Sequence, residues 1–110
     1  MNLLMMLAAL SGAVAVAAGA FGAHGAEGQA RDWLQTGGHY QLVHAIAALV
    51  ALRLDLRGPG WLFVVGGLIF AGTLYAMALG APRWLGAITP IGGATLIAGW
   101  VWLAYAGLRG

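Results

Sequence analysis

The sequence predicts an all-α membrane protein: a four-transmembrane-helix bundle with short loops and a short surface helix in the first loop. The 110-residue chain is 62% hydrophobic and only 7% charged, whereas a soluble domain is usually about 25% charged. Its uncharged stretches match the roughly 20 apolar residues that a membrane-spanning helix needs. Eight charged side chains are too few to cover a soluble monomer. We therefore expect one integral membrane domain over residues 1–110.

Four helices are expected, at residues 3–23, 38–56, 60–80 and 85–107. No Lys or Arg precedes Arg31, so the first stretch lacks the positive start of a signal peptide and is expected to remain as a helix. The second is long enough to span only if Arg53 reaches the interface, and a re-entrant or interfacial helix is its alternative. Residues 58–60 predict the turn before the third helix, and residues 81–83 separate the third from the fourth.

The longest expected connection covers residues 24–38. Glu27 and Arg31 stand four residues apart in it, which favours one short surface helix. Tryptophans near the predicted helix ends suit the boundary between lipid and water, and they are Trp33, Trp61, Trp84, Trp100 and Trp102.

The arginines give an expected orientation. Arg53, Arg57 and Arg109 fall on the side of the N-terminus, and Arg31 and Arg83 fall on the other. Because cytoplasmic loops are enriched in Lys and Arg, three against two favours a protein with both termini in the cytoplasm. Dual insertion remains the alternative.

Small residues predict how the helices pack. The first helix carries them at spacings of four and three, which places them on one face: Ala8, Gly12, Ala15, Gly19 and Gly22. The third and fourth helices add Gly72, Gly92 and Gly93. Small residues let helix backbones approach closely in lipid. We expect these positions to pack within the chain, with a homo-oligomer seam as the alternative.

Polar residues inside the expected spans are candidates for a polar or ligand site. The predicted topology gathers them at one end of the bundle: His24, His39, Tyr40, Gln41, His44, Tyr75 and Thr89. His39 and His44 stand about 140° apart on a helix, and the i, i+4 spacing of a histidine metal pair is absent. We therefore predict no metal, and expect Gln41 and His44 to bond to Tyr75 or Thr89.

Several function classes are disfavoured by the residue inventory. The chain has no cysteine, which excludes disulfides and thiol catalysis. Its net charge of +2 comes without a basic cluster, so nucleic acid is not an expected partner. The acids Glu27, Asp32 and Asp55 lie in loops or at span borders, and Ser11 is the only serine. A catalytic triad is therefore not expected.

The function expected from these observations is that of a non-enzymatic structural or accessory membrane component without a cofactor. Its expected partners are the lipid bilayer and a larger membrane complex or a second copy of the chain. One alternative is a small channel or carrier that uses the polar end. The other is a metal or cofactor binder that uses the histidines.

Six motifs follow one another along nearly the whole chain. They are Gly19-Ala20-Phe21-Gly22-Ala23-His24-Gly25, Tyr40-Gln41, His44-Ala45, Phe70-Ala71-Gly72-Thr73-Leu74-Tyr75, Leu85-Gly86 and Thr89-Pro90-Ile91-Gly92-Gly93. On these motifs the chain resembles the bacterial membrane proteins known as domain of unknown function 423, although many relatives have serine at positions 71 and 73. The resemblance implies a multi-pass protein of the bacterial inner (plasma) membrane, related to a small mitochondrial membrane protein of eukaryotes. It implies no activity.

Overall fold

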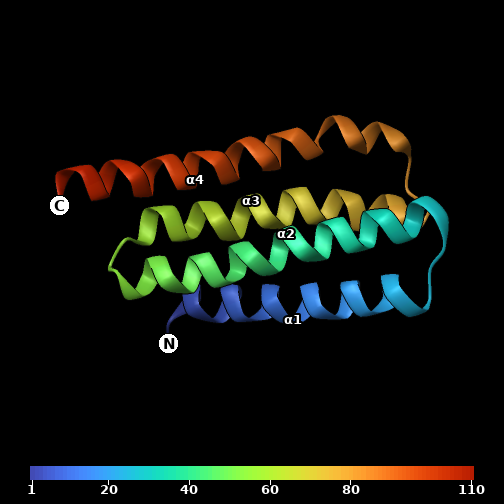
Figure 1. Cartoon of the computed structure of the whole chain (residues 1–110), viewed down its shortest axis with the longest axis horizontal. Coiled ribbons are helices and arrows are strands. Elements are labelled where there is room, and N and C mark those ends of the chain that lie inside the picture. The colour runs from blue at the N-terminus through green and yellow to red at the C-terminus, as the bar shows by residue number, and fades with distance from the viewer.

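The chain folds as an antiparallel array of helices joined by short turns (Figure 1). The computed structural model describes residues 1–110. Its helices are α1 (Leu3–His24), α2 (Gly28–Arg53), α3 (Arg57–Ala78), the 3-10 helix η1 (Arg83–Ala87) and α4 (Thr89–Arg109). The prediction of an all-α chain is confirmed.

The helices form an open array, in which neighbours in sequence are also neighbours in space. The main contacts join α1 to α2, α2 to α3, and α3 to α4. The first and last helices, α1 and α4, lie on opposite sides of the α2–α3 pair (Figure 1). A closed bundle would instead bring these two helices together. The array measures 46 × 27 × 20 Å.

The prediction of a separate surface helix in the first loop is wrong. The α2 helix begins at Gly28 rather than residue 38, and it runs without a break for 26 residues. Only residues 25–27 connect it to α1. The expected Glu27–Arg31 pair is a backbone contact, in which the Arg31 amide lies 3.4 Å from the Glu27 carbonyl oxygen.

Two glycines near the expected helix start, Gly37 and Gly38, lie inside α2. Other helices pack closely against both of them. A Cβ atom on Gly38 would lie only 2.9 Å from the carbonyl oxygen of Ala15 in α1. A Cβ atom on Gly37 would lie 2.7 Å from the ring of Tyr75 in α3. These glycines therefore mark close helix contacts, not the beginning of α2.

The turn into α3 also differs from the prediction. Residues 58–60 belong to the first turns of α3. Pro59 is tolerated there because the first four N–H groups of a helix have no acceptor within it, so the N–H that proline lacks costs no helical hydrogen bond. The chain reverses earlier, between α2 and α3, and there Asp55 takes a positive φ of 63°.

The expected fourth helix is divided into two pieces. Residues 83–87 form the 3-10 helix η1, and α4 starts only at Thr89. Pro90 occupies the first turn of α4, where its fixed φ favours a helix start. The break therefore falls where the sequence has proline.

Small residues mark where α1 meets α2. Ala8 and Ala15 are buried, and a Cβ atom on Gly22 would lie 3.0 Å from Leu34 Cβ in α2. Cβ atoms on Gly12 and Gly38 would also reach across this interface, to Ala45 Cβ at 3.8 Å and to Gly19 N at 3.2 Å respectively. Most of the stripe predicted on the first helix thus faces α2. Gly19 has its backbone beside Gly38, but a Cβ atom on Gly19 itself would meet nothing within 4 Å.

The approach of α3 to α4 is closer still. A Cβ atom on Gly92 would lie 2.4 Å from the Phe70 nitrogen and 2.9 Å from the Gly66 carbonyl oxygen, whereas one on Gly93 would meet the Phe70 ring at 3.8 Å. Gly72 does not share this role, because a Cβ atom there would meet nothing within 4 Å. It stands seven residues from exposed Val65 on the outward face of α3.

The largest buried cluster lies toward the end of the array that holds the chain termini. It contains Leu4, Ala8, Ala47, Ala48, Ala51, Phe63, Val64 and Leu96. Three segments are long and apolar enough to cross a membrane: α1, α3 and the combined residues 83–109. The α2 helix is the remaining long helix, and it carries the two buried polar side chains, Gln41 and His44.

Candidate functional site

Three side-chain hydrogen bonds join the long helices α2, α3 and α4 to one another. They connect Tyr75 Oη to Gln41 Oε1 at 2.7 Å, Trp100 Nε1 to His44 Nε2 at 2.9 Å, and Thr73 Oγ1 to Thr89 Oγ1 at 2.6 Å. We call these six residues the interhelical network. It connects α2 to α3, α2 to α4, and α3 to α4.

The surroundings of His44 define its tautomer. An indole N–H only donates, so His44 Nε2 must accept the hydrogen bond from Trp100. The other ring nitrogen, Nδ1, therefore carries the proton and donates to the Tyr40 carbonyl oxygen at 2.7 Å. The imidazole is only 6% exposed and packs against the Phe63 ring at a centroid distance of 5.6 Å. Both ring nitrogens are thus engaged within the protein.

Gln41 is the second buried polar residue of α2, with 3% of its surface exposed. Its Oε1 accepts the Tyr75 hydroxyl across the α2–α3 interface. The Thr73 and Thr89 hydroxyls lie on the other face of α3, where each also contacts a carbonyl oxygen of its own preceding turn. The interior polar groups therefore bond mainly to one another and to the backbone.

The placement of Gln41 and His44 corrects the expected cluster at one end. They lie 13 and 16 residues from the start of α2, or about 20 and 24 Å along its axis at 1.5 Å per residue. This puts them near the middle of the helix, because α2 starts earlier than the sequence suggested. Tyr75 does lie near the predicted end, in the last turn of α3, whereas Thr89 follows η1 and lies further inward, beside Thr73.

The three histidines do not form one site. His24 is an exposed residue at the end of α1, and His39 is exposed on α2. The Tyr40 ring stacks parallel to His44 at 6.3 Å, and it also contacts Phe70 at 4.9 Å. No group of three or more His, Asp or Glu side chains is placed to hold a metal ion.

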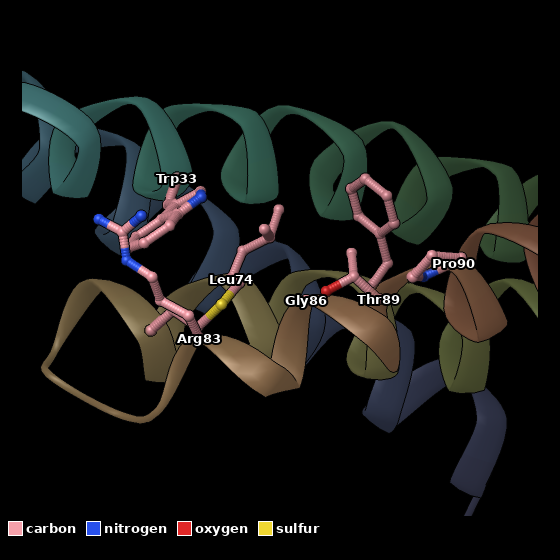
Figure 2. Close-up of a pocket in the computed structure, with 8 residues that line it drawn as sticks. Trp33, Leu74, Arg83, Gly86, Thr89 and Pro90 are labelled. Carbon is pink, nitrogen blue, oxygen red and sulfur yellow. The ribbon is translucent and has the colours of Figure 1, made fainter.

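A pocket opens beside the interhelical network, between the first turns of α2, the end of α3 and η1. Its volume is about 400 Å³, and its lining residues are Trp33, Phe70, Leu74, Met77, Arg83, Gly86, Thr89 and Pro90. Figure 2 shows Arg83 beside Trp33 at one end of this pocket, and Thr89 with Pro90 at the other. We call it the Arg83 pocket.

Two contacts hold the Arg83 side chain at the pocket. Its Nη2 donates to Gln29 Oε1 at 2.9 Å, and its guanidinium carbon lies 5.6 Å from the centre of the Trp33 ring. Both partners are neutral, so neither forms an ion pair with the guanidinium. The pocket therefore combines a fixed cation with a lining that is largely apolar.

The sequence does not mark Trp100 and Trp33 as members of the polar site. It assigned both to the membrane boundary, where tryptophans are common. The available signal was the indole N–H, which usually finds an acceptor when it is buried. His44 was an acceptor of the right kind, but only the structure identifies Trp100 as its donor.

Comparison with known proteins gives one consistent family. Residues 18–93 match the family described as protein of unknown function (DUF423). A UPF0382 membrane protein of Haemophilus influenzae is 41% identical over 120 aligned positions, covering 98% of this chain and 95% of that protein. The UPF0382 inner membrane protein YgdD of Escherichia coli is 35% identical over 119 positions, covering 96% and 89% respectively. No solved structure matches the chain significantly.

Proposed function

The chain belongs to the DUF423 family of membrane proteins, and from this premise we propose that it is a four-span inner-membrane protein with a non-enzymatic structural or accessory role. The observation that carries the proposal is the interhelical network. Its six polar side chains bond to partners on other helices, and no single pocket is lined by all of them. Such bonds give helix packing its specificity in lipid.

The proposal includes a membrane crossing by α2. With 26 residues, α2 is about 39 Å long, and so exceeds the roughly 30 Å hydrocarbon core of a bilayer. Its least apolar interior side chains, Gln41 and His44, are buried and paired. Pairing lowers the cost of placing them in lipid, which supports a fourth span.

The absence of cysteine allows a direct test of this topology. Single cysteines are introduced by Glu27→Cys, Asp55→Cys and Pro82→Cys, one in each turn, and labelled with a maleimide that cannot cross membranes. Four spans with cytoplasmic termini predict labelling of positions 27 and 82 in intact cells, and of position 55 only after permeabilisation. Labelling of positions 27 and 55 from the same side would disprove a crossing by α2. The reverse pattern would keep the four spans and invert the orientation.

The accessory role has its own test. The protein is extracted in lipid nanodiscs without detergent, and the mass of the particle's protein component is measured. We expect a stable assembly larger than the 11.3 kDa monomer, either with other membrane proteins or with further copies. Only monomers at native expression levels would contradict the proposal.

A flux assay in liposomes tests the channel or carrier alternative. The accessory role predicts no solute or ion flux from the purified protein. Flux that disappears in His44→Ala, but persists in a His24→Ala control with the same helix content, would overturn it. One stoichiometric metal ion in the purified protein would instead support the metal-binding alternative, although both His44 ring nitrogens are engaged.

A further inference from the structure

We propose that the Arg83 pocket binds one anionic phospholipid, with the phosphodiester at Arg83 and one acyl chain in the pocket beneath it. This inference requires only that the protein lies in a membrane, and it is independent of the accessory role. Three features of the pocket support it: an arginine held in place, an apolar line along α3, and a position at the helix ends.

The cation is preorganised for an anion. Gln29 and Trp33 hold the guanidinium from two sides, and neither supplies a negative charge. The acids at this end of the array, Glu27 and Asp32, form no ion pair with Arg83 within 4.0 Å. A guanidinium has five N–H donors, and the bond to Gln29 uses only one of its nitrogens. The remaining donors match the paired oxygens of a phosphodiester.

The pocket continues from Arg83 as an apolar line. Met77, Leu74 and Phe70 line it at spacings of three and four residues on α3, which places them on one helix face. They extend over about 10 Å of helix axis. The Thr89 hydroxyl at the far end is already bonded to Thr73. The line therefore offers contact surface to a hydrocarbon chain but no strong polar partner.

The position of the pocket suits a lipid lying between headgroup and bilayer interior. Arg83 begins η1, Trp33 is in the second turn of α2, and Met77 is in the last turn of α3. The neighbouring Trp84 is 64% exposed, as expected of a ring at the lipid–water boundary. From this boundary the α3 residues of the pocket run toward the middle of the array. A phosphate at Arg83 would then keep its acyl chain in the direction of the bilayer core.

The experiment measures lipid retention by the whole protein using native mass spectrometry. The protein is equilibrated with equal amounts of phosphatidylglycerol and phosphatidylcholine of identical acyl chains. We expect one phosphatidylglycerol molecule to be retained preferentially. The variant Arg83→Gln should lower this preference roughly tenfold, the loss expected when one charge-assisted hydrogen bond to the phosphate is removed. Arg31→Gln, which removes an exposed arginine at the same end, is the matched control and should leave it unchanged.

A second variant tests the acyl slot without changing charge. A Cβ atom at Gly86 would have only Met77 side-chain atoms near it, at 3.8 and 3.9 Å, so Gly86→Leu can fill the pocket. We expect it to lower retention of both lipids, with helix content unchanged in circular dichroism. Should Arg83→Gln fail to fold, two other variants still test the proposal. Gly86→Leu should lower the retention of both lipids, and the charge-preserving Arg83→Lys should keep the preference for phosphatidylglycerol.

Several outcomes would overturn the proposal. Equal losses in Arg83→Gln and Arg31→Gln would show diffuse attraction to total charge. An unchanged preference in Arg83→Gln would remove the assigned headgroup contact, and unchanged retention in Gly86→Leu would remove the acyl slot. Complete competition by millimolar inorganic phosphate would show that the arginine takes a free anion and not a lipid.

Discussion

Replacing Gly92 by alanine is expected to force α3 and α4 apart. The new Cβ atom would lie 2.4 Å from the Phe70 nitrogen, 2.8 Å from Phe70 Cα and 2.9 Å from the Gly66 carbonyl oxygen. All three are backbone atoms, so no side-chain rotation relieves the overlap. The shortest distance falls 0.6 Å below the 3.0 Å that real Cβ contacts respect. The helices must therefore shift, and they cannot do so without loosening the interface.

The neighbouring residue gives a matched control for the magnitude. Gly93→Ala adds the same methyl group one residue later, but its nearest neighbour is the Phe70 ring at 3.8 Å, an ordinary contact. Both substitutions gain about 0.5–1 kcal/mol from the lower conformational entropy of alanine. Only Gly92→Ala also incurs the overpacking cost of about 1–3 kcal/mol. The two variants should thus differ by about 1–3 kcal/mol in the free energy of unfolding, with Gly92→Ala the less stable.

The assay is reversible unfolding in mixed micelles, in which SDS is titrated against a mild detergent and helix content is followed by circular dichroism. Both variants are measured beside the unsubstituted protein. A difference between them below about 0.5 kcal/mol, the usual range for substitutions without a structural role, would refute the close contact of Gly92 with α3. Greater stability of Gly92→Ala than of Gly93→Ala would refute it more strongly.

The interhelical network gives three further predictions. Tyr75→Phe should lower the free energy of unfolding by about 0.6–2 kcal/mol, because it leaves buried Gln41 Oε1 without its donor. Adding Gln41→Leu to this variant removes the unpaired acceptor and should recover part of the lost stability in the same assay. Nitrogen NMR of labelled protein should show His44 protonated at Nδ1 and not at Nε2; the opposite tautomer would contradict the bond from Trp100. Finally, His44→Ala should destabilise the protein by about 1–3 kcal/mol, since it leaves Trp100 Nε1 and the Tyr40 carbonyl oxygen without their side-chain partner. The control His24→Ala, at an exposed position, should change stability by less than about 0.5 kcal/mol. Equal effects of the two variants would count against the network.

The sequence predicted α1 and α3 to within three residues at each end, because long apolar stretches mark both helices. It failed at the start of α2, where the charged residues Glu27, Arg31 and Asp32 predicted a connection that ended at Gly38. Glycine lowers the helix propensity of an isolated segment, but in lipid it also permits close packing. Gly37 and Gly38 permit close packing against neighbouring helices. Sequence alone does not distinguish such a glycine from one that ends a helix. The ten-residue error then moved Gln41 and His44 away from the predicted end.

The candidate polar residues were easier to select than to pair. Gln41 and His44 stand out in an apolar helix, and they are its two buried polar side chains. Their partners lie 34 and 56 residues away, and local spacing carries no information about such distances. The Arg83 pocket presents the same difficulty, because Gln29 and Trp33 reach Arg83 only after the chain has folded back on itself.

The bonds of α2 also bear on when the interior of the protein can be completed, because their donors lie in helices that follow α2 in the chain. A ribosome completes α2 before it adds Tyr75, and it adds Trp100 later still. During that interval His44 Nε2 has no access to the indole N–H that satisfies it in the finished protein. The second helix therefore leaves the ribosome with an unmet bonding requirement that only the last helix fulfils. The interior is therefore complete only once α4 has packed beside α2 and brought Trp100 to His44.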